Sequence, residues 1–310
     1  MSFLYWDDFE RRVKETVAAL KSGQNPPVRR VAVFITNKCN FKCGYCKHPI
    51  SCTTLAEERF REALEKYGST ALFHITGGEP SLVPWLYPLI RENSKRYRFN
   101  LNTNAFIEPP AEHVGRLKVS LDSCDAESWD KTVGVPGAHA RVLGNIKKAV
   151  EVNNGVSVTF TLSKANYKQS VEFAQFAARE FHKAYAVFFS VYKGTNPVYM
   201  MTDEDVDCFF DEVMPKLYNE LDRESLELIK ETLDAKQRII QGVRFPQNTA
   251  GTCYISMSER VLSTAGNEYT CSHLYRDQVY TDKPEKCDKC LYGCNRRLVK
   301  FNEEVEEGLK

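Results

Sequence analysis

The amino-acid sequence predicts an α/β fold built around a parallel sheet. Between residues 28 and 191, short apolar runs alternate with longer amphipathic segments, and this alternation is typical of βαβ units. Glycine-rich or polar residues follow several of the apolar runs, as they do where the carboxyl ends of parallel strands carry functional groups. A chain of 310 residues with 43% hydrophobic content is also long enough to bury a large core.

The predicted elements follow one another in a regular order. An amphipathic helix over residues 9–20 comes first and stops at the Gly-Pro break of 23–27. Six strands are then expected from the apolar runs at 28–35, 71–75, 99–102, 117–121, 156–162 and 185–191. Helical patterns fill the gaps at 54–67, 85–97, 141–152 and 169–181.

The pattern changes after about residue 201. Two long charged helices are predicted at 203–217 and 223–241, and a β-hairpin with a Gly-Asn turn is predicted at 259–270. The hairpin lies in a Cys-rich segment that ends in an acidic tail. We therefore expect four parts, which are an N-terminal helix and linker (1–28), an α/β domain (29–200), a helical bridge (201–247) and a small Cys-rich module (248–310).

Charge and composition exclude several classes of partner. The formal net charge is +1, which provides no general attraction to nucleic acid or to anionic membranes. No apolar run approaches the ~18 residues that span a bilayer, and the first residues lack a signal-peptide core. Eleven cysteines in tight clusters favour metal binding in a reducing compartment. We expect a cytoplasmic protein with no nucleic-acid and no membrane partner.

The most informative stretch follows the first predicted strand. Cys39, Cys43 and Cys46 are spaced C-x3-C-x2-C, and Tyr45 precedes the last of them. Three thiolates on one loop can hold an iron-sulfur cluster and leave one iron open to a further ligand. A zinc ion completed by a nearby His or Cys is the alternative.

Further polar segments follow the next strands. Gly77-Gly78-Glu79-Pro80 comes directly after the second strand, where glycines permit close backbone approach and the carboxylate can accept from an ammonium group. As an isolated tetrapeptide this segment can also be a plain turn. The ends of the third, fourth and fifth strands carry Asn102, Asn104, Ser120, Asp122 and Asn166, which are either caps and turn formers or ligand contacts.

The two motifs in this order resemble those of the radical S-adenosylmethionine (radical SAM) enzymes, and the resemblance runs from about residue 29 to 297. It implies that residues 29–200 form a partial (β/α)6 TIM-like barrel. It also implies a 4Fe-4S cluster on Cys39, Cys43 and Cys46 whose open iron binds SAM, and a reductant such as flavodoxin or ferredoxin. The implied SAM contacts are Tyr45 at the adenine, Gly77, Gly78, Glu79 and Pro80 at the amino group, and Asn102, Asn104, Ser120, Asp122 and Asn166 elsewhere.

A second set of cysteines lies in the terminal module. These are Cys253, Cys271, Cys287, Cys290 and Cys294. The set is similar to the shorter, Twitch form of the SPASM extension of radical SAM enzymes. Five thiols cannot ligate two cubanes, so we expect one auxiliary 4Fe-4S cluster with Cys290 as its fourth ligand and Cys294 as the competitor. A zinc ribbon is the alternative.

The remaining thiols and the substrate are less constrained. Cys124 and Cys208 are either small buried side chains or, by the resemblance, hydrogen donors to a substrate radical. The implied reaction is an oxidation, epimerisation or cross-link on a peptide. About 30 residues before the first strand are too few for a leader-recognition domain, which favours a short peptide that binds directly or, as the first alternative, a small molecule such as an aminocyclitol or sugar in natural-product biosynthesis. The second is a non-catalytic zinc-binding interaction protein.

Overall fold

The computed structural model describes residues 9–46, 51–192, 196–233, 252–270, 285–286 and 296–310. The chain divides into two compact units. One comprises Met1–Lys38, Ile50–Leu101 and Pro246–Lys310, and the other comprises Cys39–Pro49 and Asn102–Phe245. Within the described ranges, no helix combines the length and the apolar character that crossing a bilayer requires.

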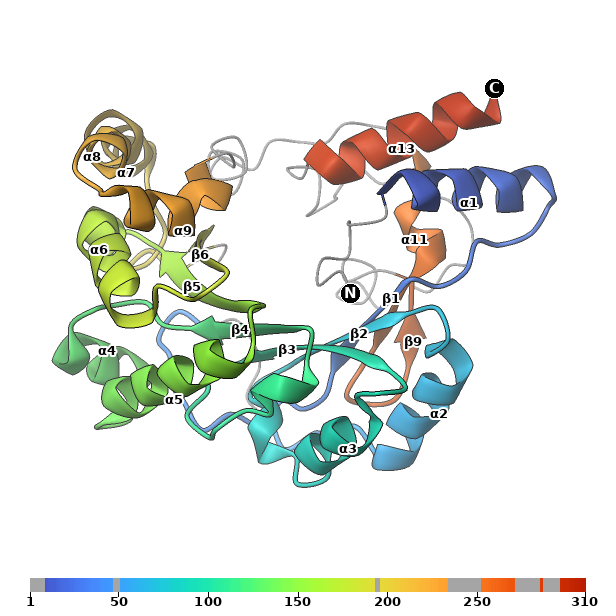
Figure 1. Cartoon of the computed structure of the whole chain (residues 1–310), viewed down its shortest axis with the longest axis horizontal. Helices are drawn as coiled ribbons and strands as arrows, with labels where there is room; N and C mark the ends of the chain where they lie inside the picture. Colours follow the sequence, from blue (N-terminus) through green and yellow to red (C-terminus); the bar gives the residue numbers. More distant parts are fainter. Residues whose placement is uncertain (1–8, 47–50, 193–195, 234–251, 271–284, 287–295) are drawn as a thin grey trace. The chain divides into compact units, whose positions relative to one another are not determined.

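The fold confirms the predicted α/β class. The six predicted strands are present among the described residues and run parallel, β1 (Arg30–Phe34), β2 (Leu72–Thr76), β3 (Arg98–Thr103), β4 (Arg116–Ser120), β5 (Val156–Leu162) and β6 (Ala186–Val191). The helices between them are α2 (Glu57–Tyr67), α3 (Leu86–Asn93), α4 (Ala126–Val133), α5 (Ala138–Val152) and α6 (Ser170–Phe181) (Figure 1). The sequence prediction missed α4, a short helix that Asp125 caps at its N-terminus and Gly134 ends in the left-handed conformation.

In the first unit, β1 lies between two parallel neighbours. It pairs with β2 on one edge and with β8 (Glu259–Leu262) on the other. Strand β9 (Glu268–Tyr269) then pairs antiparallel with β8, and Gly266 takes a φ of 82° in the turn between them. The predicted hairpin is therefore present, and it extends the sheet at the strand that leads to Cys39.

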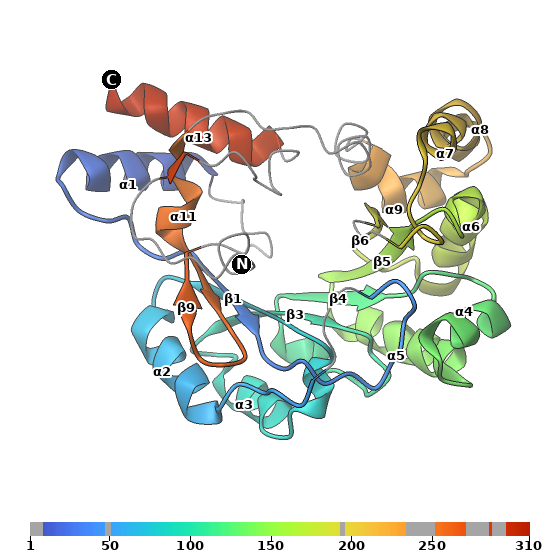
Figure 2. The ribbon, with the colours of Figure 1, turned by 180° about the vertical axis from the view of Figure 1, so that it is seen from behind.

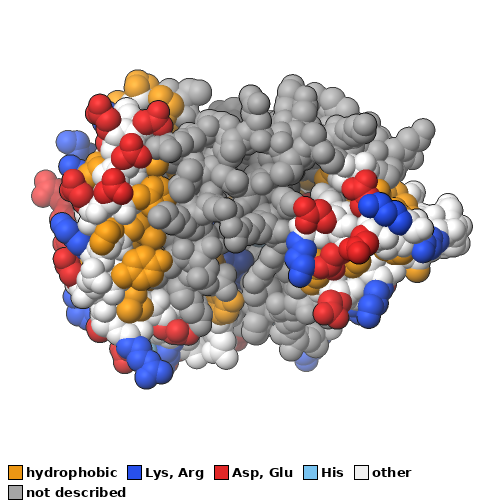
Figure 3. Space-filling view, turned by 90° about the horizontal axis from the view of Figure 1, so that it is seen from above, with side chains coloured by type: hydrophobic (Ala, Val, Ile, Leu, Met, Phe, Trp, Pro, Cys, Tyr) orange, Lys and Arg blue, Asp and Glu red, His pale blue; other side chains and the backbone are white. Residues whose placement is uncertain are grey.

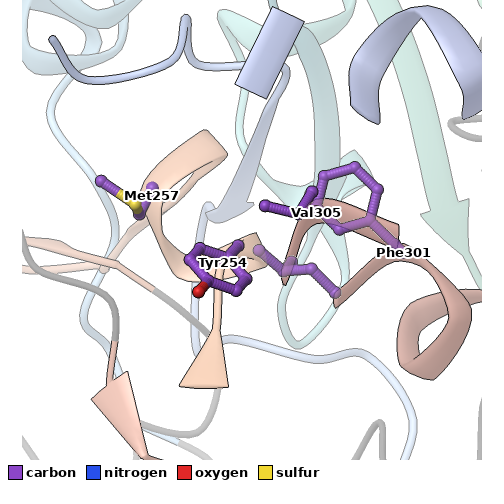
Figure 4. Packing of buried hydrophobic residues seen from close by; sticks show 5 residues of the cluster. Tyr254, Met257, Phe301 and Val305 are labelled. Atoms are coloured by element: carbon purple, nitrogen blue, oxygen red, sulfur yellow. The ribbon is translucent and has the colours of Figure 1, made fainter. Parts of the chain in front are cut away.

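The terminal residues of the chain form a helix that packs on the first one. Helix α13 (Arg296–Leu309) repeats apolar residues at Phe301, Val305 and Leu309, the spacing of one helical face. Together with α1 (Phe9–Lys21) and α11 (Ile255–Ser258), it buries a small core (Figure 4). Charged side chains of both signs lie over α1 and α13, at the right of Figure 3. The acidic tail expected from composition is thus the outer face of an amphipathic helix.

In the second unit, β4, β5 and β6 pair in parallel. Helices α5 and α6 lie side by side against these strands (Figure 2). The predicted helix over 203–217 is instead α7 (Asp203–Cys208), a π-helical turn (Phe209–Val213) and α8 (Met214–Asn219). Pro215 lacks a backbone N–H and so cannot continue a regular ladder through this point. Helix α9 (Arg223–Leu233) matches the start of the last predicted helix, and residues 234–241 lie outside the described residues.

Candidate functional site

The segment between β1 and Cys39 contacts the two glycines that follow β2. We call residues 39–46, which carry the three cysteines, the Cys loop. Gly78 N donates to Thr36 O at 2.6 Å, and Glu79 N donates to Lys38 O at 2.7 Å. A Cβ on Gly77 would lie 2.5 Å from Thr36 O, and one on Gly78 would lie 2.2 Å from Lys38 O. Gly77 also has a φ of 148°, which side chains disfavour. Only glycine allows this approach, so the motif fixes the backbone that enters the loop at Cys39.

The carboxylate of the same motif is buried. Glu79 is 0% exposed, and its Oε1 accepts from Ser81 N at 2.9 Å. It caps the short helix Pro80–Leu82, in which Pro80 is buried. Glu79 therefore stabilises the turn after β2 through a charge-assisted hydrogen bond.

Phe41 anchors the middle of the loop. Its side chain is 3% exposed, and its ring meets those of Phe106 and Trp129 edge-on, with centroids 5.7 Å away in each case. Edge-to-face pairs of this kind contribute beyond the area that they bury. The loop therefore reaches the core of the second unit through an aromatic residue placed between two cysteines.

Polar contacts hold the loop on either side of Phe41. Asn104 Nδ2 donates to Asn40 Oδ1 at 2.8 Å, and Lys42 N donates to Val133 O at the end of α4 at 2.8 Å. Asn104 Oδ1 accepts from the backbone after it, so both ends of its amide are engaged. Asn104, predicted as a SAM contact, thus binds the Cys loop in this structure.

The three thiols lie along this anchored loop. Cys46 N donates to Cys43 O at 2.9 Å, which forms a turn, and the Cys46 side chain is exposed. Burial, followed by the nearby charge of Asp122, raises the pKa of the Cys43 thiol to about 12. Among the described residues, no group of three or more His, Cys, Asp or Glu side chains is arranged around one metal-ion position. Three thiols on one loop supply the soft ligands that iron-sulfur clusters take.

Tyr45 connects the loop to the ends of β4 and β5. Its hydroxyl donates to Asp122 Oδ2, while Thr161 N donates to Asp122 Oδ1 at 2.5 Å. Asn166 Nδ2 donates to Thr161 O at 3.0 Å and to Asp122 O at 3.3 Å. Asp122 is buried, and burial raises its pKa above the usual range. Three of the predicted SAM contacts, Tyr45, Asp122 and Asn166, therefore form one network.

Tyr199 is a part of the site that the sequence prediction missed. A Cβ on Gly44 would lie 2.3 Å from the Tyr199 hydroxyl, and the rings of Tyr45 and Tyr199 meet edge-on at 5.8 Å. Lys164 N donates to Tyr199 O at 3.0 Å, which ties this residue to the end of β5. No motif surrounds Tyr199, so contact with a residue this distant along the chain could not be read from local sequence.

Comparison with known proteins identifies the domain that carries this site. Residues 33–177 match the model of the Radical SAM superfamily. The chain contains a radical SAM domain. The matched residues include the Cys loop, the Gly77-Gly78-Glu79-Pro80 motif and the Asp122 network.

Individual relatives extend the likeness beyond this domain. The AdoMet-dependent heme synthase of Methanosarcina barkeri is 26% identical over 276 residues, which cover 79% of this chain and 77% of that protein. A probable GTP 3',8-cyclase of Archaeoglobus fulgidus is 31% identical over 147 residues, so this chain spans 48% of that protein's length. The solved structure of native anSMEcpe with bound AdoMet and Kp18Cys peptide has a TM-score of 0.59 at 18% identity and covers 92% of this chain and 84% of that one. The last likeness supports the fold, which matches the partial barrel of radical SAM enzymes.

Two predicted SAM contacts in the radical SAM domain have polar atoms that could bind a polar ligand. Asn102 Oδ1, on β3, is buried with no hydrogen-bond partner within the described part of the chain. Ser120, at the end of β4, is exposed. Unlike Asn104 and Asn166, these two predicted contacts have capacity left for a donor group on SAM.

Three of the other predicted thiols, Cys124, Cys208 and Cys253, lie within the described residues. Cys124 is partly buried beside Glu172, and burial, then this carboxylate, raises its pKa to about 11. Cys208 ends α7 within hydrogen-bonding reach of Tyr167. Cys253 lies in β7 (Thr252–Cys253), which pairs with β10 (Glu285–Lys286). The other four predicted auxiliary ligands, Cys271, Cys287, Cys290 and Cys294, lie outside the described residues.

Proposed function

We propose that the chain is a radical SAM enzyme that reductively cleaves SAM and abstracts a hydrogen atom from a peptide substrate. The observation that carries the proposal is the set of contacts that holds the Cys loop in place. Its entry is fixed to the backbone of Gly77 and Gly78, its middle is buried through Phe41, and its end is tied to Asp122 through Tyr45. A metal-binding loop held at three points keeps its ligands in place.

Each residue then has a distinct role. Cys39, Cys43 and Cys46 would hold a 4Fe-4S cluster, which in its reduced form would supply the electron for cleavage of SAM to methionine and a 5'-deoxyadenosyl radical. The turn at Gly77 to Glu79 presents backbone carbonyls to the SAM amino group. Asn102 Oδ1 accepts a hydrogen bond from SAM, because this buried acceptor has no partner among the described residues. Tyr45 backs the adenine while its hydroxyl stays on Asp122.

The substrate assignment rests on two kinds of support. A structural neighbour, anSMEcpe, was solved with AdoMet and a peptide. The set of five cysteines after residue 252 has the size needed for one auxiliary 4Fe-4S cluster, which would take up or return an electron as the peptide is oxidised, epimerised or cross-linked. A flavodoxin or ferredoxin would supply the first electron.

A second candidate is favoured by the heme synthase relative. That protein aligns with 79% of this chain, a longer match than the radical SAM domain itself. Its name assigns it an AdoMet-dependent step in heme formation, so a tetrapyrrole or another small molecule is the competing substrate class. The two substrate classes are separated by incubating the reduced enzyme with SAM and one of two candidate substrates, either a peptide encoded by a neighbouring gene or a porphyrin precursor. Mass spectrometry of both substrates then shows which one is modified.

Anaerobic reconstitution tests the proposed activity. The wild-type chain should be brown and bind about eight iron and eight sulfide atoms, the content of two cubanes, and its dithionite-reduced form should release 5'-deoxyadenosine from SAM. Replacing Cys39, Cys43 and Cys46 together by Ala should remove about four of the iron atoms and abolish this release. The exposed Cys52 supplies the control, since Cys52→Ala should keep both properties.

Two other outcomes would change the assignment. A wild-type chain with about four iron atoms, all lost in the triple variant, would remove the auxiliary cluster from the proposal. A colourless chain with stoichiometric zinc and no SAM cleavage would instead support a zinc-binding interaction protein.

A further inference from the structure

One face of the sheet in the second unit carries polar and cationic side chains. Along β4 these are Arg116, Lys118 and Ser120, and the parallel register pairs Lys118 with Ser157 and Ser120 with Thr159 on β5. Paired residues of adjacent strands point to the same face. Arg116 Nε donates to Ser157 Oγ at 3.2 Å, which confirms that the two side chains share this face.

The opposite face of the same strands is apolar. The alternate residues Leu117 and Val119 on β4, and Val158 and Phe160 on β5, are each 0% exposed. Phe160 packs on Phe173 of α6, with ring centroids 4.7 Å apart. Core-facing positions of parallel strands normally carry branched apolar residues on both sides. A lysine, an arginine and hydroxyl groups on the second face are therefore unusual for a structural core.

Lys118 is placed where a positive charge is unfavourable. Burial, followed by the nearby charge of Arg116, lowers its pKa to about 8, and the carboxylate of Asp122 offsets this only in part. Burial also raises the pKa of Asp122, which reduces the negative charge that it offers. Within the described part of the chain, Asp122 acts on the Lys118 ammonium group through its charge, without a hydrogen bond or a close ion pair. A cation in this setting is stabilised by an oxyanion that replaces its lost water.

Thr159 supplies a second polar group that has no partner in the part of the chain that the structure describes. Its side chain is 6% exposed, and among the described residues nothing bonds to its buried Oγ1. Thr159 is the diagonal neighbour of Lys118 across β4 and β5, a separation of about 7–8 Å that a lysine side chain spans. The ammonium and the hydroxyl can therefore donate to the same small group.

We propose that Lys118 and Thr159 form a subsite for an anionic group of the substrate, a carboxylate or a phosphate. This inference rests on the proposed radical SAM function and narrows its substrate to a molecule that carries such a group. Lys118 lies two residues before Ser120 on β4, or about 6–7 Å at the strand rise. The subsite therefore holds the anionic end of the substrate next to the positions predicted for SAM, on the amino-terminal side of β4.

Calorimetric titration of the reconstituted full chain tests this without turnover. Glutarate serves as the carboxylate probe and inorganic pyrophosphate as the phosphate probe, and the one that binds identifies the group. Lys118→Met should weaken that probe at least 10-fold, about 1.4 kcal/mol, and Thr159→Val should weaken it about 3-fold to 10-fold. The matched control is Lys148→Met, which removes an exposed lysine of α5 and should leave the affinity unchanged.

A second pair of measurements protects the test against misfolding. Lys118→Arg keeps the charge and should keep most of the affinity. Because the pKa of Lys118 is about 8, probe affinity of the wild-type chain should fall between about pH 7 and 9 as the ammonium deprotonates, whereas that of Lys118→Arg should stay level, since Arg remains charged.

Three results would overturn the subsite. They are binding of neither probe to the wild-type chain, equal affinities in wild type and Lys118→Met, and a loss of SAM affinity in Lys118→Met with unchanged probe affinity. The last would assign Lys118 to the SAM carboxylate. Failure of the proposed function is distinct, because it appears as a wild-type chain that carries full iron and releases no 5'-deoxyadenosine.

Discussion

Replacing Gly78 by Ala should detach the root of the Cys loop without unfolding the chain. The new Cβ would lie 2.2 Å from Lys38 O and 2.8 Å from Lys38 C, and both are backbone atoms that no rotamer change can move. The collision would displace the hydrogen bonds of 2.6 and 2.7 Å that join Gly78 and Glu79 to Thr36 and Lys38. Two such bonds at about 1 kcal/mol each, with about 1–3 kcal/mol of steric strain, give a loss of about 3–5 kcal/mol.

The prediction is measured by thermal melting and by iron content. At about 2 °C per kcal/mol for a chain of this size, Gly78→Ala should lower Tm by about 6–10 °C and should lose iron from the loop. Gly144→Ala is the matched control, because nothing lies within 4 Å of a Cβ at Gly144 and alanine favours helix α5. Equal Tm and equal iron content in Gly78→Ala and wild type would refute the role given to the glycine contacts.

Three further predictions follow from other described contacts. Phe41→Ala should lower the free energy of unfolding by about 3–5 kcal/mol and reduce iron retention, and an unchanged Tm would show that Phe41 does not anchor the loop. Because the pKa of Cys124 is about 11, about one molecule in a thousand carries the Cys124 thiolate at pH 8. Mass spectrometry should therefore find that iodoacetamide labels Cys124 more slowly than the exposed Cys52. The rate of labelling at Cys124 should rise tenfold per pH unit up to about pH 11. Phe301→Ala, at the centre of the core between α1 and α13, should cost about 3–5 kcal/mol with little effect on the Cys loop, which a guanidinium melt and iron analysis would check together.

Local sequence was sufficient for the fold class and for the Cys loop. The alternation of apolar runs and amphipathic segments predicted β1 to β6 because this pattern is a property of each segment by itself. The position of Tyr199 against Gly44 depends on which segments pack together, and so does the Thr159 hydroxyl, which has no partner among the described residues. No window of sequence contains this information. The unusual environment of Lys118 was missed for a related reason. It arises from the burial of this side chain and from the charges near it, which only the folded chain brings together.

The pairing of β1 also joins the Cys-rich module to the first strand of the sheet. Sequence reasoning treated residues 248–310 as a separate module, yet β8 joins the parallel edge of β1 over four residue pairs, Arg30 to Val33. Strand β2, which leads to Gly77, joins the other edge. Strand β1 is thus hydrogen-bonded on one side to β2 and on the other to β8, the first strand of the terminal hairpin. Because β1 and β8 share one ladder of hydrogen bonds, a change in β8 reaches β1 by a path within one compact unit. The terminal segment therefore stabilises β1, the strand that precedes the Cys loop in the sequence.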